Sequence, residues 1–181
     1  MSEEREALRE KLLSPRKNGY DRIKAEELQA MERYCGLYKT FLQQGKTERE
    51  CARVAVELAE KAGFKPYERG AALAAGDKIY RVNRDKSVML AVIGRESLAQ
   101  GAHIVAAHID SPRLDLKPNP LYEDSELAFF KTHYYGGIRK YQWGTMPLAI
   151  HGVFTRADGS SVSVCVGEDE SDPVFCITDL L

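Results

Sequence analysis

Residues 107 to 118 read AHIDSPRLDLKP, and the interpretation of the whole chain starts from this stretch. It ends an apolar run with His108 and Asp110, two positions apart, and then turns at Ser111-Pro112. Residues two apart on a strand point to the same side. We therefore expect His108 and Asp110 to project together from the carboxyl end of a central strand, where α/β folds place their ligands.

The segments just before this stretch predict the sheet to which it belongs. Residues 87–94 and 103–110 are short, continuous apolar runs, typical of strands buried on both faces. KIYRVN at 78–83 alternates apolar and polar residues, and a turn at 83–86 connects it to 87–94. The pattern indicates a hairpin followed by a further central strand.

Two amphipathic helices precede this sheet. Residues 25–44 carry apolar side chains at helical spacing. Thr47 and Glu50 form a capping-box signature at the start of a second helix, which Gly63 closes. Helices and central strands then share one core, so we interpret residues 1–117 as an α/β layer structure.

Beyond residue 117 the pattern changes to β-like segments. Pro118 and Pro120 are expected to interrupt the chain, and a second, antiparallel β unit is expected over 118–181. Thr178-Asp179 is typical of a helix N-cap, although only two apolar residues follow it, so we expect the chain to be a piece of a longer protein. The predicted strands of this unit lie at 126–135, 146–156, 161–167 and 173–177.

The composition excludes several classes of partner. The 181 residues include 26 basic and 27 acidic side chains, a balance that favours neither nucleic acid nor an anionic membrane. No apolar stretch approaches the roughly 20 residues that span a bilayer, and the polar N-terminus does not resemble a signal peptide. We expect a cytoplasmic protein whose four cysteines, with no C-x-x-C pair, are reduced thiols.

The residues around His108 allow three chemical interpretations. His108 could bind a divalent metal while Asp110 fixes its orientation. Alternatively, His108 is a hydrogen-bonded core histidine and Asp110 caps the turn before the proline. Ser111 could act as a nucleophile, but no G-x-S-x-G elbow surrounds it.

The other candidate residues favour structural roles. His103 is an odd number of positions from His108, which places it on the opposite face of the predicted strand. His133 and His151 lie in the β segments, where a structural role is expected. Residues 134–143 (YYGGIRKYQW) contain two glycines without phosphate-loop spacing, so a turn or bulge is expected there rather than a nucleotide site.

Four segments together resemble a known enzyme family. AAHIDSPRLDLKP, HYYGGIRKYQW, MPLAIHGVF and PVFCITDLL, in this order and spacing, are similar to the M18 zinc metallo-aminopeptidases, and most to the bacterial branch. The resemblance implies the N-terminal part of a three-layer α/β/α zinc-peptidase domain over 1–117. It also implies the start of an inserted antiparallel β dimerisation domain over 118–181, and assembly of the complete protein into a homo-oligomeric dodecamer.

The resemblance also implies roles for individual residues. His108 matches the family's first zinc ligand, and Asp110 matches the catalytic aspartate that orients the metal site. Two zinc ions per complete site and peptide substrates with a free amino end are implied, and the remaining ligands are expected from sequence beyond these 181 residues. Which N-terminal residue of a peptide substrate is preferred stays open. The competing interpretation is a non-catalytic fragment or assembly module that retains part of the oligomer interface.

Overall fold

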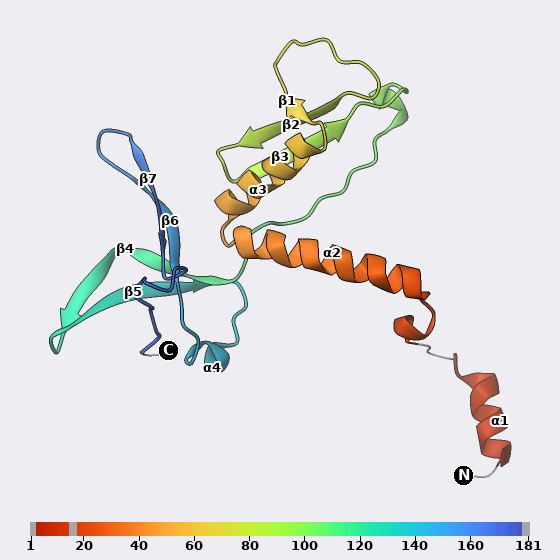
Figure 1. Ribbon diagram of the computed structural model, residues 1–181, viewed down its shortest axis with the longest axis horizontal. Helices are drawn as coiled ribbons and strands as arrows, with labels where there is room; N and C mark the ends of the chain where they lie inside the picture. Colours follow the sequence, from red (N-terminus) through yellow and green to blue (C-terminus); the bar gives the residue numbers. More distant parts are fainter. Residues whose placement is uncertain (1–2, 15–17, 179–181) are drawn as a thin grey trace. The chain divides into compact units, whose positions relative to one another are not determined.

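The computed structural model describes residues 3–14 and 18–178 (Figure 1). The chain divides into two compact units, one ending at Thr40 and the other beginning at Phe41. Helices and strands are mixed, which confirms the predicted α/β class. Among the described residues, no helix is both long and apolar enough to cross a membrane.

The first unit is helical. It contains α1 (Glu3–Leu12), a 3₁₀ turn (Gly19–Asp21) and most of α2 (Ala25–Gln44). The bounds of α2 agree with the helix predicted at 25–44, whereas α1 was not predicted. No residue of α2 is buried, and Leu37 is 74% exposed. The apolar stripe of α2 is therefore largely exposed.

Helix α3 (Glu48–Lys61) holds the buried core of the second unit. Its N-terminus has the predicted capping box, because the Thr47 amide donates to Glu50 (2.9 Å) and the Glu50 amide donates to Thr47 Oγ1 (3.3 Å). Gly45 must lack a side chain, since a Cβ there would lie 2.7 Å from Cys51 Sγ. The buried residues of α3 are Cys51, Ala52, Val54 and Ala59.

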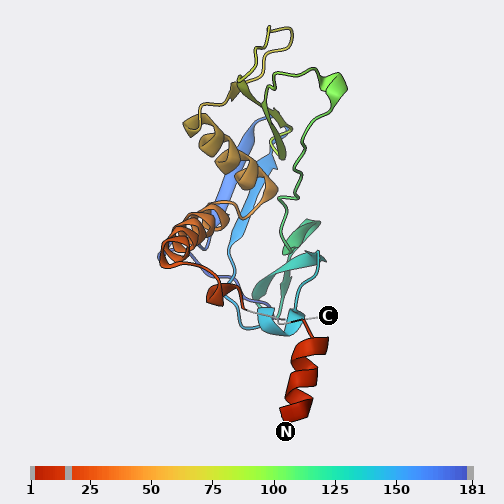
Figure 2. The same cartoon turned by 90° about the vertical axis from the view of Figure 1, so that its right-hand side faces the viewer.

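Helix α3 packs against a three-stranded sheet (Figure 2). Its strands, in the order β1-β2-β3, are β1 (Lys65–Pro66), β2 (Lys78–Asn83) and β3 (Ser87–Val92). β1 pairs with β2 in parallel, and β2 and β3 form the predicted antiparallel hairpin. Both faces of β3 were predicted to be buried, which is wrong here: Met89 is 63% exposed and Val92 60%.

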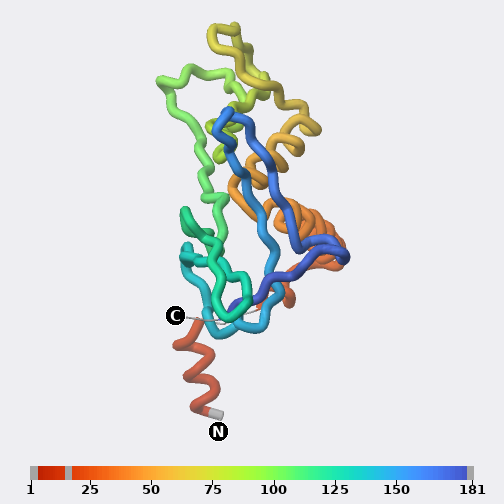
Figure 3. Tube along the Cα trace, turned by 90° about the vertical axis from the view of Figure 1, so that its left-hand side faces the viewer, coloured from red at the N-terminus to blue at the C-terminus, as the bar shows by residue number. Residues whose placement is uncertain are grey.

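The predicted strand at 103–110 is also wrong. Residues 101–112 have no regular secondary structure and run as an extended connection from β3 toward β4 (Figure 3). Ile104 and Val105 are 85% and 99% exposed. A strand exists through hydrogen bonds to a neighbouring strand, and within the described residues none pairs with this segment. The prediction that His103 and His108 lie on opposite faces of a strand therefore does not apply, because no strand forms here.

Two further hairpins complete the second unit. β4 (Arg113–Asp124) pairs with β5 (Leu127–Tyr135), and β6 (Ile150–Thr155) pairs with β7 (Ser161–Val166). A short helix, α4 (Lys140–Trp143), lies between β5 and β6 in the chain. The strand predicted at 173–177 is reduced to one bridge, between Leu148 and Phe175, and Asp179 of the predicted N-cap lies outside the described residues.

The two prolines expected to interrupt the chain lie inside β4. The register of β4 and β5 shifts between Leu116 and Leu121, and Pro118 and Pro120 fall within that shift. Proline lacks an amide proton, so it is tolerated in a strand where the ladder is already interrupted by a bulge. The domain boundary predicted at 117/118 falls within β4 and stays a prediction.

Candidate metal-ligand site

His108 lies in the extended segment before β4, and its imidazole is oriented by Asp110. His108 Nδ1 is 3.1 Å from Asp110 Oδ1 and 3.0 Å from the Asp110 carbonyl oxygen. Both neighbours are acceptors, so in the neutral imidazole the proton belongs on Nδ1. The lone pair is then on Nε2, and the side chain is 84% exposed. Metal-binding histidines are commonly arranged in this way.

Asp110 is itself held from the far side by Tyr135. The Tyr135 hydroxyl donates to Asp110 Oδ2 at 2.6 Å. This hydrogen bond, with a smaller contribution from His108, lowers the pKa of Asp110. The same bond and the charge of Asp110 raise the pKa of Tyr135. Asp110 is therefore held as a carboxylate acceptor, and Tyr135 as a protonated donor.

Arg113 connects this group to the rest of the second unit. Its guanidinium carbon lies 4.2 Å from the centre of the Tyr135 ring, a cation–π contact. Arg113 Nε donates to Asp115 Oδ1 at 2.7 Å, and Arg113 Nη1 is 3.9 Å from Glu48 Oε2 at the start of α3. Burial acts to lower the pKa of Arg113, but Asp115 and Glu48 outweigh it and raise the pKa.

The donors near His108 fit one metal ligand rather than a complete metal site. Over residues 3–14 and 18–178, no three His, Cys, Asp or Glu side chains are grouped so that they could hold a metal ion. A catalytic zinc normally has about three protein ligands and an open position for water. His108 Nδ1 is paired with Asp110 rather than with Ser111.

A second histidine cluster was not predicted from the sequence. His151 Nδ1 is 2.9 Å from Glu50 Oε1, and Nε2 is 3.0 Å from Glu168 Oε1. The His151 side chain is only 13% exposed. Burial acts to lower the pKa of His151, but the hydrogen bonds with Glu50 and Glu168 outweigh it and raise the pKa. His151 therefore connects the capping box of α3 to the β6–β7 hairpin.

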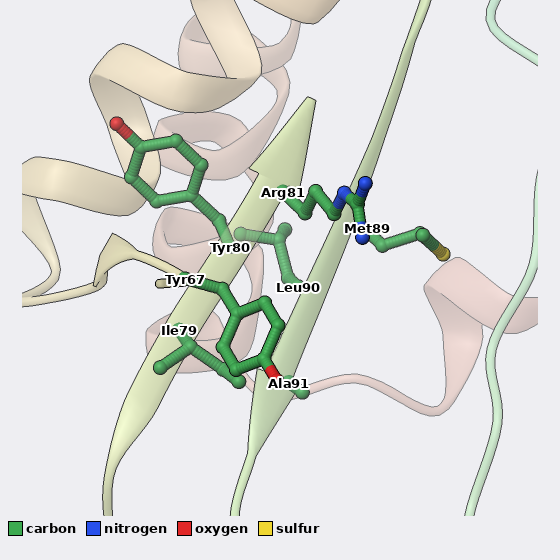
Figure 4. Close-up of a pocket in the computed structure, with 7 residues that line it drawn as sticks. All are labelled: Tyr67, Ile79, Tyr80, Arg81, Met89, Leu90 and Ala91. Atoms are coloured by element: carbon green, nitrogen blue, oxygen red, sulfur yellow. The ribbon is translucent and has the colours of Figure 1, made fainter. Parts of the chain in front are cut away.

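The face of the β2–β3 hairpin opposite α3 carries a shallow apolar hollow of about 240 Å³ (Figure 4). The strand residues that line it are Ile79, Tyr80, Arg81, Met89, Leu90 and Ala91, and Tyr67 borders it beyond β1. None of these side chains is a common metal ligand, so the hollow adds nothing to the site at His108.

Comparisons with known proteins identify relatives of most of the chain. The family described as aminopeptidase I zinc metalloprotease (M18) matches residues 41–181. A probable M18 family aminopeptidase 1 of Clostridium acetobutylicum is 50% identical over 174 residues, which are 94% of this chain and 37% of that protein.

Solved structures agree with the sequence matches. The crystal structure of aminopeptidase I from Borrelia burgdorferi B31 has a TM-score of 0.85 at 43% identity and covers 90% of this chain and 40% of that one. The M18 structure from Thermotoga maritima has a TM-score of 0.80 at 43% identity, covering 93% and 37%. The chain thus spans 36 to 37% of the length of the first curated relatives that it matches.

Proposed function

Because the chain belongs to the M18 family of aminopeptidase I zinc metalloproteases, we propose that it supplies the His108-bearing part of a zinc aminopeptidase. The observation that carries this proposal is the His108–Asp110 pair, in which one imidazole nitrogen is held and the other is exposed. The proposed reaction is the release of N-terminal residues from peptides.

Each residue of the pair has a distinct proposed role. His108 binds zinc through Nε2, and Asp110 holds the imidazole in the tautomer that makes Nε2 a ligand. Zinc held there would supply Lewis-acid chemistry, because it would polarise a substrate carbonyl and make water a better nucleophile near neutral pH. We propose two zinc ions per complete site, with the remaining ligands outside these 181 residues.

The proposal extends to partners. The substrates are peptides with a free amino end, and the complete protein is a homo-oligomer, for which the family resemblance implies a dodecamer. The near-balanced charge, with a net value of −1, gives no reason to add a nucleic acid or an anionic membrane to the partners. The cytoplasmic location stays a prediction.

One observation favours the competing function, a non-catalytic assembly module. The described residues bring a single candidate ligand together with its orienting carboxylate. A module of this kind would retain the β hairpins without chemistry. The two functions differ in what His108 does in a protein of full family length.

The experiment replaces the matched segment of the Clostridium acetobutylicum relative with residues 1–181 and compares two variants. His108→Ala should lose zinc and nearly all aminopeptidase activity, because it removes a direct ligand. His103→Ala, in the same extended segment, should keep both. If His108→Ala kept near-normal zinc and activity, the proposed role of His108 would be wrong. If the unmutated hybrid bound no zinc and released no residues, the assembly module would be the better account.

A further inference from the structure

The ends of β4 and β5 meet beside the candidate ligand. Arg113, the first residue of β4, is the register partner of Tyr135, the last residue of β5. Gly136 follows with a φ of +73°, and a Cβ on it would lie 3.4 Å from Pro112. Glycine is favoured at a positive φ. The chain leaving β5 therefore passes close to the Ser111-Pro112 turn, which brings the Tyr135 hydroxyl to Asp110.

The two oxygens of Asp110 have different partners on different elements. Oδ1 faces His108 Nδ1 at 3.1 Å, and Oδ2 accepts from the Tyr135 hydroxyl at 2.6 Å. One hydrogen bond alone would leave the carboxylate free to rotate about its terminal torsion, which is broad for Asp. Two bonds in different directions fix the carboxylate plane and thereby Oδ1, which together with the Asp110 carbonyl oxygen faces His108 Nδ1.

The Tyr135 ring is held in place independently of Asp110. Arg113 lies over one face of the ring at 4.2 Å, and its own position is fixed by Asp115 at 2.7 Å. The Arg113 side chain is 29% exposed. Removing the Tyr135 hydroxyl would leave this stacking in place, so the hydroxyl can be tested separately from the hairpin.

We propose that Tyr135 is a positioning residue for the metal ligand His108, acting through Asp110. This inference rests on the proposed function, because it assigns Tyr135 to the same site. The consequence is that the β4–β5 hairpin must form before His108 takes its ligand orientation. Losses of about 10- to 100-fold in metal affinity or activity are typical when a residue supporting a metal ligand is removed.

The test compares Tyr135→Phe with Tyr134→Phe in the 181-residue chain. Tyr134 is the neighbouring, 51% exposed tyrosine of β5, so its variant makes the same chemical change on the other face of the strand. Ring-nitrogen NMR shifts of the chain's four histidines report which nitrogen carries the proton. Solid-state spectra of sedimented chain keep this measurement available if the chain associates.

In metal-free samples at a pH where imidazole is neutral, His108 should be protonated on Nδ1 in the unmutated chain and in Tyr134→Phe. In Tyr135→Phe it should move toward the tautomer mixture of exposed His103, while the backbone shifts of β4 and β5 stay unchanged. A His108 tautomer that is the same in all three proteins would overturn the inference, as would a change in Tyr135→Phe that spreads through the whole hairpin.

A Zn²⁺ titration followed at the His108 ring separates this inference from the proposed function. We expect binding at His108 to be about 10-fold weaker in Tyr135→Phe than in Tyr134→Phe. If His108 did not respond to Zn²⁺ in the unmutated chain, the proposed function would lose support, and the metal-free tautomers would still decide what Tyr135 does to His108. Equal Zn²⁺ affinity in the two variants would contradict the positioning role of Tyr135 but not the role of His108 as a ligand.

Discussion

Replacing His151 with glutamine should weaken the attachment of the β6–β7 hairpin to α3. The His151 ring contacts Glu50 through Nδ1 at 2.9 Å and Glu168 through Nε2 at 3.0 Å. Both ring nitrogens can donate at once only in the imidazolium. The unmutated chain therefore gains two charge-assisted hydrogen bonds that the neutral glutamine amide cannot reproduce.

The expected loss follows from the exposure of the three side chains. Hydrogen bonds to charged groups contribute about 1.5–3 kcal/mol each when shielded, whereas exposed ion pairs contribute about 0.2–1 kcal/mol. His151 is 13% exposed, but Glu50 and Glu168 are 27% and 33% exposed, so the pairs lie between these limits. We expect His151→Gln to lower the free energy of unfolding by roughly 2 kcal/mol at pH 6.

The pH dependence has a definite sign. The pKa of folded His151 is raised from its usual 6.5, so its contribution is fully present below about pH 6.5 and is lost as pH rises through the folded pKa. Burial acts to raise the pKa of Glu50, but His151 outweighs it and lowers the pKa below its usual 4.5, so that contribution is lost as pH falls through the folded value. The free energy of unfolding of His151→Gln should differ most from that of the unmutated chain between about pH 4.5 and 6.5.

Thermal unfolding followed by the fluorescence of Trp143, the only tryptophan, measures the effect. A loss of roughly 2 kcal/mol corresponds to about 4–8 °C in Tm for a chain of this size. His133→Gln is the control, since His133 is exposed and stacks only on Tyr134 among its described ring contacts. Equal Tm values for His151→Gln and the unmutated chain at pH 6, or a difference that grows from pH 6 to pH 9, would refute the reasoning.

Three further predictions concern the chain itself. Thr47→Ala should lower the free energy of unfolding by about 1 kcal/mol in urea titrations, because it removes the capping box of α3, and no change would contradict that role. The isolated chain should hold zinc only weakly, so metal analysis after dialysis should find no stoichiometric pair; two tightly held ions per chain would contradict this. Exposed Met89, Leu90 and Val105 should cause self-association in sedimentation at micromolar concentration, and a monomeric mass there would contradict it.

Local sequence signals predicted much of the fold. The α2 helix, the capping box at Thr47 and Glu50, the hairpin at 78–92 and the strands at 150–155 and 161–166 agree with the structure. In each case the information lies within a few residues: helical spacing, a cap, or a turn between two alternating segments. Such signals do not depend on what the rest of the chain does.

The predictions that failed were those that depended on how a segment pairs with other strands of the chain. The apolar run at 103–110 has strand character, but no strand pairs with it within residues 3–14 and 18–178, so it stays extended and exposed. Pro118 and Pro120 indicated an interruption, yet a register shift in β4 accommodates both. Residue composition alone does not show which backbone groups will find partners.

In the candidate site, too, local sequence predicted some contacts, and others arise only from the fold. His108 and Asp110 were expected to project together because they are two apart, and their 3.1 Å contact forms without any strand. Tyr135 is 25 positions from Asp110, and His151 is 101 positions from Glu50, so only the fold could bring these pairs together. No local sequence signal assigned a role to Tyr135, and the capping box at Glu50 gave no indication of its contact with His151.

The most direct test of the account is the position of zinc relative to His108. Anomalous X-ray diffraction at the zinc edge, on crystals of a protein of full family length that carries residues 1–181, locates the metal without relying on activity. We expect a zinc peak within coordination distance of His108 Nε2, with Nδ1 still facing Asp110. Zinc bound at Nδ1, or zinc in the crystal with no peak near His108, would contradict it.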